Sequence, residues 1–219
     1  MVELETLQIP YKSEQWYRMR QFGIGGSDAS SIYGVSKWKS AIELWEEKTG
    51  KREPKDLSGN KAVEYGTKAE EHLTKLFVLD YPQYSLIDTK DTIYRRGFMF
   101  ASLDGELLEV STGKKGFLEI KTSEIRSSAD WGKWKDKIPL YYYTQLLHYF
   151  LVTDFDFAYL KVQLKEYDKD GDVVLHTKHY RFEKSDCIND MRKLYNAEKE
   201  FYDCVKNNKM PPIRISLLS

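Results

Sequence analysis

The spacing of the apolar residues changes at about Ser85. Upstream of it, apolar residues recur at helical spacing, and downstream of it they fall into short strand-like runs. The order along the chain is helices, a strand meander, a helix, a hairpin and a final helix. This order predicts a single α/β (α+β) domain over residues 1–219, with a mixed central sheet flanked by helices.

Local signals predict where the elements begin and end. Ser13 is expected to cap a helix through Phe22, and Ser27 or Asp28 a second helix to about Ile32. Further helices are predicted at 40–50, at 61–81 with a break or kink near Gly66 and a stop at Pro82, at 138–153, and at 185–208 with Ser185 or Asp186 as cap. Strands are predicted within 91–110, 117–123, 157–168 and 172–182.

Composition excludes several classes of protein. The 219 residues are 41% hydrophobic and include 5 Trp, 16 Tyr and 10 Phe, which suffices for a core and argues against disorder. No run approaches the roughly 18 apolar residues of a membrane span. The first residues lack the features of a secretion signal. Cys187 and Cys204 fit no metal-binding spacing, so a reduced cytoplasmic setting is expected.

Charge restricts how this chain can bind nucleic acid. Lys plus Arg and Asp plus Glu both number 34, so a general basic surface is absent. A DNA partner therefore requires locally clustered positive charge, and metal ions that neutralise some of the carboxylates.

The residues that suggest chemistry gather around one predicted hairpin. Asp104 stands at a strand end in SLDGE, and FLEIKTS carries Glu119 and Lys121. Strand side chains alternate, so Glu119 and Lys121 are expected to share one face while Ile120 points to the other. Pairing through the STGKKG turn would bring Asp104 beside Glu119. Glu70 on the upstream helix is a candidate further carboxylate.

Such a cluster suits phosphodiester hydrolysis. Carboxylate oxygens are hard ligands for Mg²⁺, which binds through few carboxylates plus substrate phosphate. The metal activates a water and offsets phosphate charge, while a nearby Lys orients the water or stabilises negative charge. Acid-x-Lys pairs also occur by chance on exposed strands. The apolar neighbours Phe117, Leu118 and Ile120 argue against a plain solvated strand here.

Five motifs follow one another from residue 16 to about residue 153. They are QWYRMRQFGIGGSDASSIYGVSKWKSAIELWEEKTG, EYGTKAEEHL, ASLDGELLE, FLEIKTS and IPLYYYTQLLHYFLVT. In this order they resemble the lambda-exonuclease/YqaJ group of phage recombination nucleases, which belongs to the PD-(D/E)XK superfamily. Two departures are Leu103, where that family has proline, and Tyr65, where it has tryptophan.

The resemblance implies a catalytic role for five positions. Asp104 and Glu119 would bind metal, with the backbone carbonyl of Ile120 as a further ligand. Lys121 would be the catalytic lysine, and Glu70 would join the metal or water network.

The resemblance also assigns residues around that cluster. Gln145 would line the site, although the residues alone favour a satisfied amide in a helix core. Arg20 and Ser27 would hold the 5′-phosphate of a DNA end, with Trp16 nearby.

Other basic residues are weaker candidates for DNA contact. They are Arg95, Arg96, Lys133 and Lys135. Plain surface charge explains each of them as well.

The implied fold is a restriction-endonuclease-like PD-(D/E)XK core, and the implied activity is a Mg²⁺-dependent, ATP-independent 5′-to-3′ exonuclease on linear double-stranded DNA. It would leave 3′ single strands for an annealing protein. Two Mg²⁺ per site, with Mn²⁺ as a substitute, a homotrimer, and a phage or prophage origin in bacterial cytoplasm are also implied. The alternatives are an endonuclease or single-strand nuclease of the same fold, and a non-catalytic module that binds DNA ends or protein.

The GIGGSDA stretch at residues 23–29 needs separate treatment. Gly23, Gly25 and Gly26 do not make GxGxxG, no GK[ST] follows, and a helix is expected before them, so no nucleotide cofactor is predicted. Close backbone approach beside Ser27 and Arg20 suits a terminal phosphate instead. A plain capped turn is the alternative.

Overall fold

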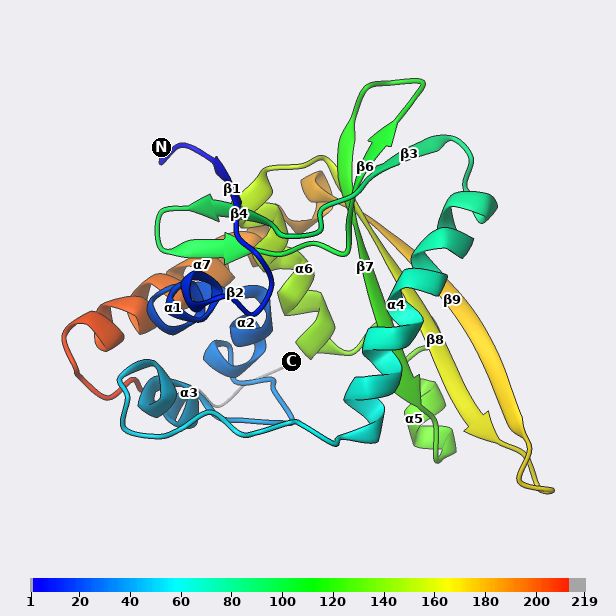
Figure 1. Cartoon of the computed structure of the whole chain (residues 1–219), viewed down its shortest axis with the longest axis horizontal. Helices are drawn as coiled ribbons and strands as arrows, with labels where there is room; N and C mark the ends of the chain where they lie inside the picture. Colours follow the sequence, from blue (N-terminus) through cyan, green and yellow to red (C-terminus); the bar gives the residue numbers. More distant parts are fainter. Residues whose placement is uncertain (1, 213–219) are drawn as a thin grey trace.

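The computed structural model describes residues 2–212 and contains two β-sheets flanked by helices (Figure 1). The larger sheet has five strands in the order β3 (Tyr84–Ile87), β6 (Gly105–Glu109), β7 (Lys115–Glu124), β8 (Phe157–Tyr167) and β9 (Val173–Glu183). β7 and β8 run parallel, whereas every other neighbouring pair in this sheet is antiparallel. The predicted mixed central sheet is therefore confirmed.

Helices α4 (Lys61–Asp80) and α6 (Leu140–Thr153) pack on opposite faces of this sheet, as side-chain alternation along β7 shows. Leu118 and Ile120 pack with Phe77 of α4, whereas Phe117 packs against Phe150 of α6. Because strand side chains alternate, Glu119 shares the α6 face with Phe117. The expectation that Ile120 points away from Glu119 is correct.

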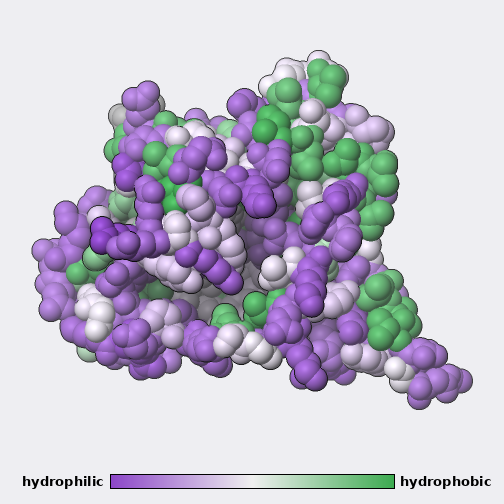
Figure 2. All heavy atoms as spheres, viewed as in Figure 1, coloured by the Kyte–Doolittle hydropathy of each residue, from purple (hydrophilic) through white to green (hydrophobic). Residues whose placement is uncertain are grey.

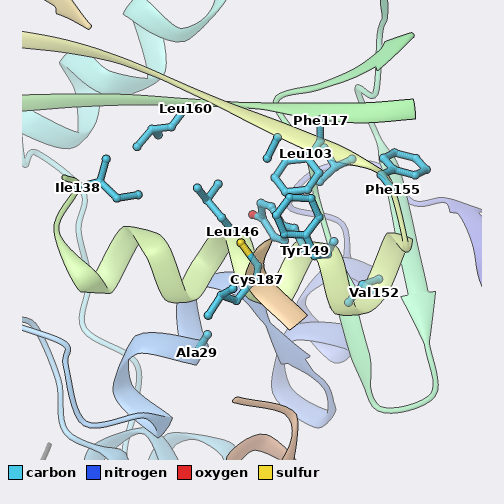
Figure 3. Close-up of a cluster of buried hydrophobic side chains, with 14 of the residues drawn as sticks. Ala29, Leu103, Phe117, Ile138, Leu146, Tyr149, Val152, Phe155, Leu160 and Cys187 are labelled. Atoms are coloured by element: carbon cyan, nitrogen blue, oxygen red, sulfur yellow. The ribbon is translucent and has the colours of Figure 1, made fainter. Parts of the chain in front are cut away.

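Helix α6 is the centre of the main core (Figure 3). It is apolar on most of its surface, which is typical of a helix enclosed by other elements. Leu146, Phe150 and Val152 are each at most 1% exposed. Leu103, the residue that replaces the proline of the resembling family, is buried in the same cluster and so contributes to packing.

The smaller sheet has the order β1 (Glu5–Gln8), β4 (Thr92–Arg96), β5 (Met99–Ala101) and β2 (Ile24–Gly25). Helices α1 (Glu14–Phe22) and α2 (Gly26–Ile32) precede and follow β2 directly. Helices α3 (Ala41–Lys48) and α7 (Lys184–Lys206) pack together through Trp45 and Phe201, and α5 (Ser128–Gly132) is a short helix after β7. The glycine stretch is thus the junction between a short strand and a helix.

Several local expectations are wrong in detail. Helix α2 begins at Gly26, so Asp28 lies in its first turn and accepts the Gly25 N–H from there. Helix α4 is continuous through Gly66, and its position close to Thr122 of β7 explains a residue without Cβ. Helix α7 starts after Glu183 with no side-chain cap. Within residues 2–212, no helix is both long enough and apolar enough to span a bilayer.

Candidate active site at the β6–β7 hairpin

The β6–β7 hairpin brings Asp104 to the middle of β7. Gly105 pairs with Leu118 at the end of the antiparallel ladder, which leaves Asp104 just beyond it. Asp104 Oδ2 accepts the backbone N–H of Ile120 at 2.7 Å. This hydrogen bond fixes the carboxylate beside the strand that carries Glu119, as the hairpin predicted.

Glu119 is held from two sides. Its Oε1 forms an ion pair with Lys121 Nζ on the same strand face and accepts a hydrogen bond from Gln145 Nε2 at 2.7 Å. Glu119 is 2% exposed, so this arrangement lies inside the protein. The predicted grouping of Glu119, Lys121 and Gln145 is present.

The pKa values reflect burial and the crowding of negative charge. Burial and then the charge of Asp104 raise the pKa of Glu119 to about 8. Burial likewise raises the pKa of Asp104 against the lowering effect of Lys121. Burial alone would lower the pKa of Lys121, but Glu119 and Asp104 outweigh it and raise that pKa. The lysine is therefore an ammonium group at neutral pH.

Glu70 belongs to the same electrostatic group although its side chain is exposed. Partial desolvation on α4, followed by the charge of Asp104, raises the pKa of Glu70 to about 7. Lys121 acts in the opposite direction. The charge of Asp104 affects Glu70, which agrees with the prediction that a carboxylate on this helix takes part in the site.

A divalent cation fits this donor set. Within residues 2–212 no three His, Cys, Asp or Glu side chains form a ready-made cluster for a metal. Mg²⁺ does not need one, because it keeps several waters and uses one or two carboxylates with substrate phosphate. Glu119 Oε2 is buried and has no hydrogen-bond partner among the described residues. An orphaned hard oxygen beside Asp104 is the ligand that such a cation takes.

Tyr149 is a site residue that the sequence analysis missed. Gln145 Nε2 donates to its hydroxyl at 2.9 Å, one helical turn along α6. Burial, then the charges of Glu119 and Asp104, raise the pKa of Tyr149 well above its ordinary value. The sequence signal that could have identified Tyr149 is its i, i+4 spacing from Gln145.

Arg20 and Ser27 lie together, as the 5′-phosphate assignment requires. The Arg20 guanidinium stacks over the Trp16 ring, 4.8 Å from its centroid, and donates to Ser27 Oγ at 3.3 Å. Ser27 is exposed in the first turn of α2. A half-buried guanidinium, an exposed hydroxyl and a helix start can bind an anion together.

A buried ion pair between Lys48 and Asp28, which the sequence analysis did not predict, supports the region around Arg20 and Ser27. Lys48 Nζ lies 2.7 Å from Asp28 Oδ2 and donates to the carbonyl of Gly23 at 2.7 Å and to that of Arg20. One buried ammonium thus ties α3 to the end of α1 and the start of α2. The glycines have a packing role here, because a Cβ on Gly25 would stand 2.7 Å from the ring of Phe100.

Three of the four weaker DNA-contact candidates already make contacts within the protein. Arg95 pairs with Glu5 at 2.8 Å, and Arg96 donates to the carbonyl of Val152 at 2.9 Å. Lys133 pairs with Asp130 at 2.8 Å at the end of α5. Lys135 is exposed.

The surface is hollowed between the side formed by α1–α3 and the side formed by α4 (Figure 2). α6 and β7 cross between these two sides (Figure 1). Hydrophilic residues predominate around the hollow on this face.

Two solved structures with a similar fold are exonucleases. The crystal structure of an alkaline exonuclease, LHK-Exo from Laribacter hongkongensis, matches with a TM-score of 0.55 and 16% identity over 90% of this chain and 96% of that one. A phage-related exonuclease from Haemophilus somnus 129PT matches with a TM-score of 0.54 and 16% identity over 85% and 96%. At these identities the matches show the shared fold, and the PD-(D/E)XK-like fold class is confirmed.

Sequence relatives identify the family. The uncharacterized protein YqaJ of Bacillus subtilis (strain 168) is 31% identical over 173 residues, 74% of this chain and 51% of that protein, so the chain spans about half the length of this curated relative. The model of the YqaJ-like viral recombinase domain matches residues 15–156, which include Asp104, Glu119, Lys121 and Gln145. This chain therefore belongs to the YqaJ-like viral recombinase family.

Proposed function

We propose that this chain is a metal-dependent deoxyribonuclease that degrades linear double-stranded DNA from its 5′ ends. The observation that carries the proposal is the environment of Glu119. One of its oxygens is held by Lys121 and Gln145, while the other is buried without a partner. A buried, unpaired carboxylate oxygen is costly unless a cation completes it. Family membership and the exonuclease fold support the same reaction.

Each residue of the candidate active site has its own proposed role in phosphodiester hydrolysis. Asp104 and Glu119 would hold Mg²⁺ or Mn²⁺, with Glu70 and the Ile120 carbonyl as further ligands of a two-ion site, and the metal would acidify a water and offset phosphate charge. Lys121 donates a hydrogen bond to the attacking water or to a phosphate oxygen. The water loses a proton to solvent as its oxygen binds phosphorus, the P–O3′ bond breaks, and the leaving O3′ takes up a proton to become a free 3′-hydroxyl.

Gln145 is proposed to position Glu119. Its amide holds Oε1 and at the same time contacts the Tyr149 hydroxyl, which fixes the amide orientation. Because Glu119 cannot rotate freely, its second oxygen stays directed at one place.

Arg20 and Ser27 are proposed to bind the terminal 5′-phosphate, with Trp16 orienting the guanidinium. Their corner lies next to the catalytic group, since Gly26 packs against Tyr149 and Gln145. A phosphate held there would place the first nucleotides of the strand near Glu119. Arg95, Arg96, Lys133 and Lys135 are proposed to contribute at most weak contacts to the DNA backbone.

Family membership supports a proposal about the biological setting. We propose that the product is a duplex with 3′ single-stranded tails, which a single-strand annealing protein then uses in phage-type homologous recombination. A homotrimer, independence of ATP, and action in a bacterial cytoplasm on behalf of a phage or prophage belong to the same proposal.

One substrate comparison tests the activity. Purified protein is incubated with Mg²⁺ and no nucleotide on 5′-phosphorylated linear, 5′-hydroxyl linear and covalently closed circular duplexes. Each linear duplex carries separate labels on bases near its 5′ and 3′ ends, and the circle carries a label on an internal base. We expect the phosphorylated linear duplex to lose its 5′ label first and the circle to stay intact. Cleavage of the circle would indicate an endonuclease, and no cleavage of any substrate would indicate a non-catalytic module.

A further inference from the structure

Trp38 is an exposed aromatic residue on the loop between α2 and α3. Its side chain is 60% exposed. The loop itself is held in place: Ser36 Oγ accepts the Trp38 N–H at 3.2 Å, and the N–H of Ser36 donates to the Ser30 carbonyl at 3.0 Å. The ring is therefore presented to solvent by a defined turn.

Trp38 extends an aromatic cluster that reaches the catalytic lysine. Its ring lies edge-on to Tyr141, with centroids 4.9 Å apart, and 6.3 Å from the ring of Tyr142. Lys121 Nζ lies 5.7 Å from the Tyr142 centroid. Only one ring thus separates Trp38 from a catalytic group.

Positive charge accompanies the exposed ring. Lys37 Nζ stands 4.8 Å from the Trp38 centroid and 4.9 Å from that of Tyr141. A surface cavity of about 490 Å³ adjoins the loop, lined by residues 36–43 together with Ser31 and Gly34. Cavities of this size accommodate ligands as large as a nucleotide.

Stacking rings interleaved with lysine are the chemistry that recognises unpaired nucleobases. Every base has a π-face that stacks on an aromatic side chain, and a neighbouring ammonium pairs with the phosphate. A base inside a duplex offers no such face, because stacked neighbours cover both of its sides. We propose that Trp38, Tyr141 and Lys37 form a subsite that stacks one unpaired nucleobase of the strand at the active site.

The subsite rests on the proposed nuclease function and adds a requirement to it. The terminal base must leave its partner before the phosphate reaches Lys121. Stacking on Trp38 would compensate for the lost pairing and hold the strand in position for hydrolysis.

Binding to a phosphorothioate-linked single strand, with Mg²⁺ present, tests the subsite without hydrolysis. Quenching of a 2-aminopurine base placed at successive positions reports stacking. We expect Trp38→Ala to weaken binding about tenfold and to abolish quenching at one position near the 5′ end. Trp38→Phe should retain most of both. Because Trp38 is exposed, unchanged circular dichroism should show that these variants fold.

Tyr167→Ala is the matched control. Tyr167 is 51% exposed and also lies beside a lysine, Lys165, 5.1 Å from its ring, but it sits at the far turn between β8 and β9 (Figure 1). This variant should bind the single strand as the wild type does.

Removing the base provides a second comparison. An abasic nucleotide at the quenched position should weaken wild-type binding by the same factor and have no further effect on Trp38→Ala. Unchanged affinity of Trp38→Ala, no measurable binding by wild type, or multiplication of the two effects would overturn the subsite. Normal stacking by a protein that hydrolyses no DNA would instead overturn the proposed nuclease function and leave the subsite intact.

Discussion

Gly26 lies against Tyr149 so closely that no Cβ fits between them. A Cβ at Gly26 would stand 2.9 Å from Tyr149 Cζ and 3.1 Å from Gln145 Cγ. The first turn of α2, which carries Ser27, is therefore packed directly on the helix face that holds Glu119. The two halves of the candidate site are coupled through this contact.

The first prediction concerns that contact. Gly26→Ala should lower the free energy of unfolding by about 1–3 kcal/mol, because the added Cβ would clash with the buried Tyr149 ring and force it to shift. It should also reduce hydrolysis by displacing Gln145 from Glu119. Chemical denaturation and initial rates measure both. Gly132→Ala is the control, since nothing lies within 4 Å of its Cβ position; an equal loss in both variants would contradict the packing argument.

The second prediction concerns catalysis. Asp104→Asn and Lys121→Ala should each lower kcat on a linear duplex about a thousandfold or more, because charge at the scissile phosphate is no longer balanced. Folding should persist in both variants, as judged by circular dichroism. Lys114→Ala, which removes an exposed lysine of the β6–β7 turn, should leave kcat unchanged. Full activity in either site variant would refute the assignment of the site.

The third prediction concerns metal and pH. The folded pKa of Glu119 is about 8, against 4.5 ordinarily, so its stabilising contribution is complete below pH 4.5 and is lost as pH rises through about 8. A bound cation replaces the proton. Mg²⁺ should therefore raise Tm more at pH 8 than at pH 5, with a stabilisation of about 2.7 kcal/mol at a hundredfold excess over Kd.

Scanning calorimetry at several pH values, with and without Mg²⁺, measures this difference. Glu119→Gln keeps the shape of the side chain and removes the charge. It should abolish most of the Mg²⁺ effect. A Mg²⁺ shift that is the same at both pH values, or that persists in Glu119→Gln, would contradict the prediction.

The fourth prediction concerns a buried ion pair. His148 Nδ1 lies 2.8 Å from Glu198 Oε1 and Nε2 lies 2.9 Å from the Phe100 carbonyl, so both ring nitrogens face acceptors. Burial alone would lower the pKa of His148, but Glu198 outweighs it and raises the pKa above 6.5. This stabilisation is complete below pH 6.5 and is lost as pH rises through the folded pKa.

Replacing Glu198 should show how the pKa of His148 makes the stability of the fold depend on pH. Glu198→Gln should cost about 3–5 kcal/mol near pH 6, where the imidazolium is left without its counter-charge. The loss should shrink as pH rises and the imidazole becomes neutral. Urea denaturation of both proteins from pH 6 to 9 measures it, and a loss independent of pH would show that His148 is neutral in the fold.

The fifth prediction concerns the DNA end. Arg20→Ala should reduce the ratio of kcat/KM for 5′-phosphorylated over 5′-hydroxyl duplex about tenfold, since a charged hydrogen bond to phosphate is removed. Arg18→Ala is the matched control on α1, because Arg18 pairs with Glu14 on the exposed side of that helix. If wild type cuts both ends at the same rate, Arg20 and Ser27 have another role.

Local sequence patterns were sufficient to predict the hairpin of the candidate active site. Strand alternation places Glu119 and Lys121 on one face, and the glycine-containing turn returns the chain so that Asp104 meets Ile120. Strand alternation has a period of two residues, and the hairpin turn spans only a few residues. Both can therefore be predicted from the local sequence. The family motifs extended the same inference to Gln145 and Arg20.

Contacts between distant segments were decided by the tertiary structure. The Gln145 amide reaches Glu119 because α6 packs on one face of β7, and Gly26 is needed because Tyr149 occupies the space of its side chain. Trp38 is exposed because its loop is held by the local hydrogen bonds of Ser36 instead of being packed inside. Sequence periodicity determines which residues share a face of one element. Which faces meet, and which aromatic rings remain uncovered, depends on how side chains far apart in the chain fill the interior.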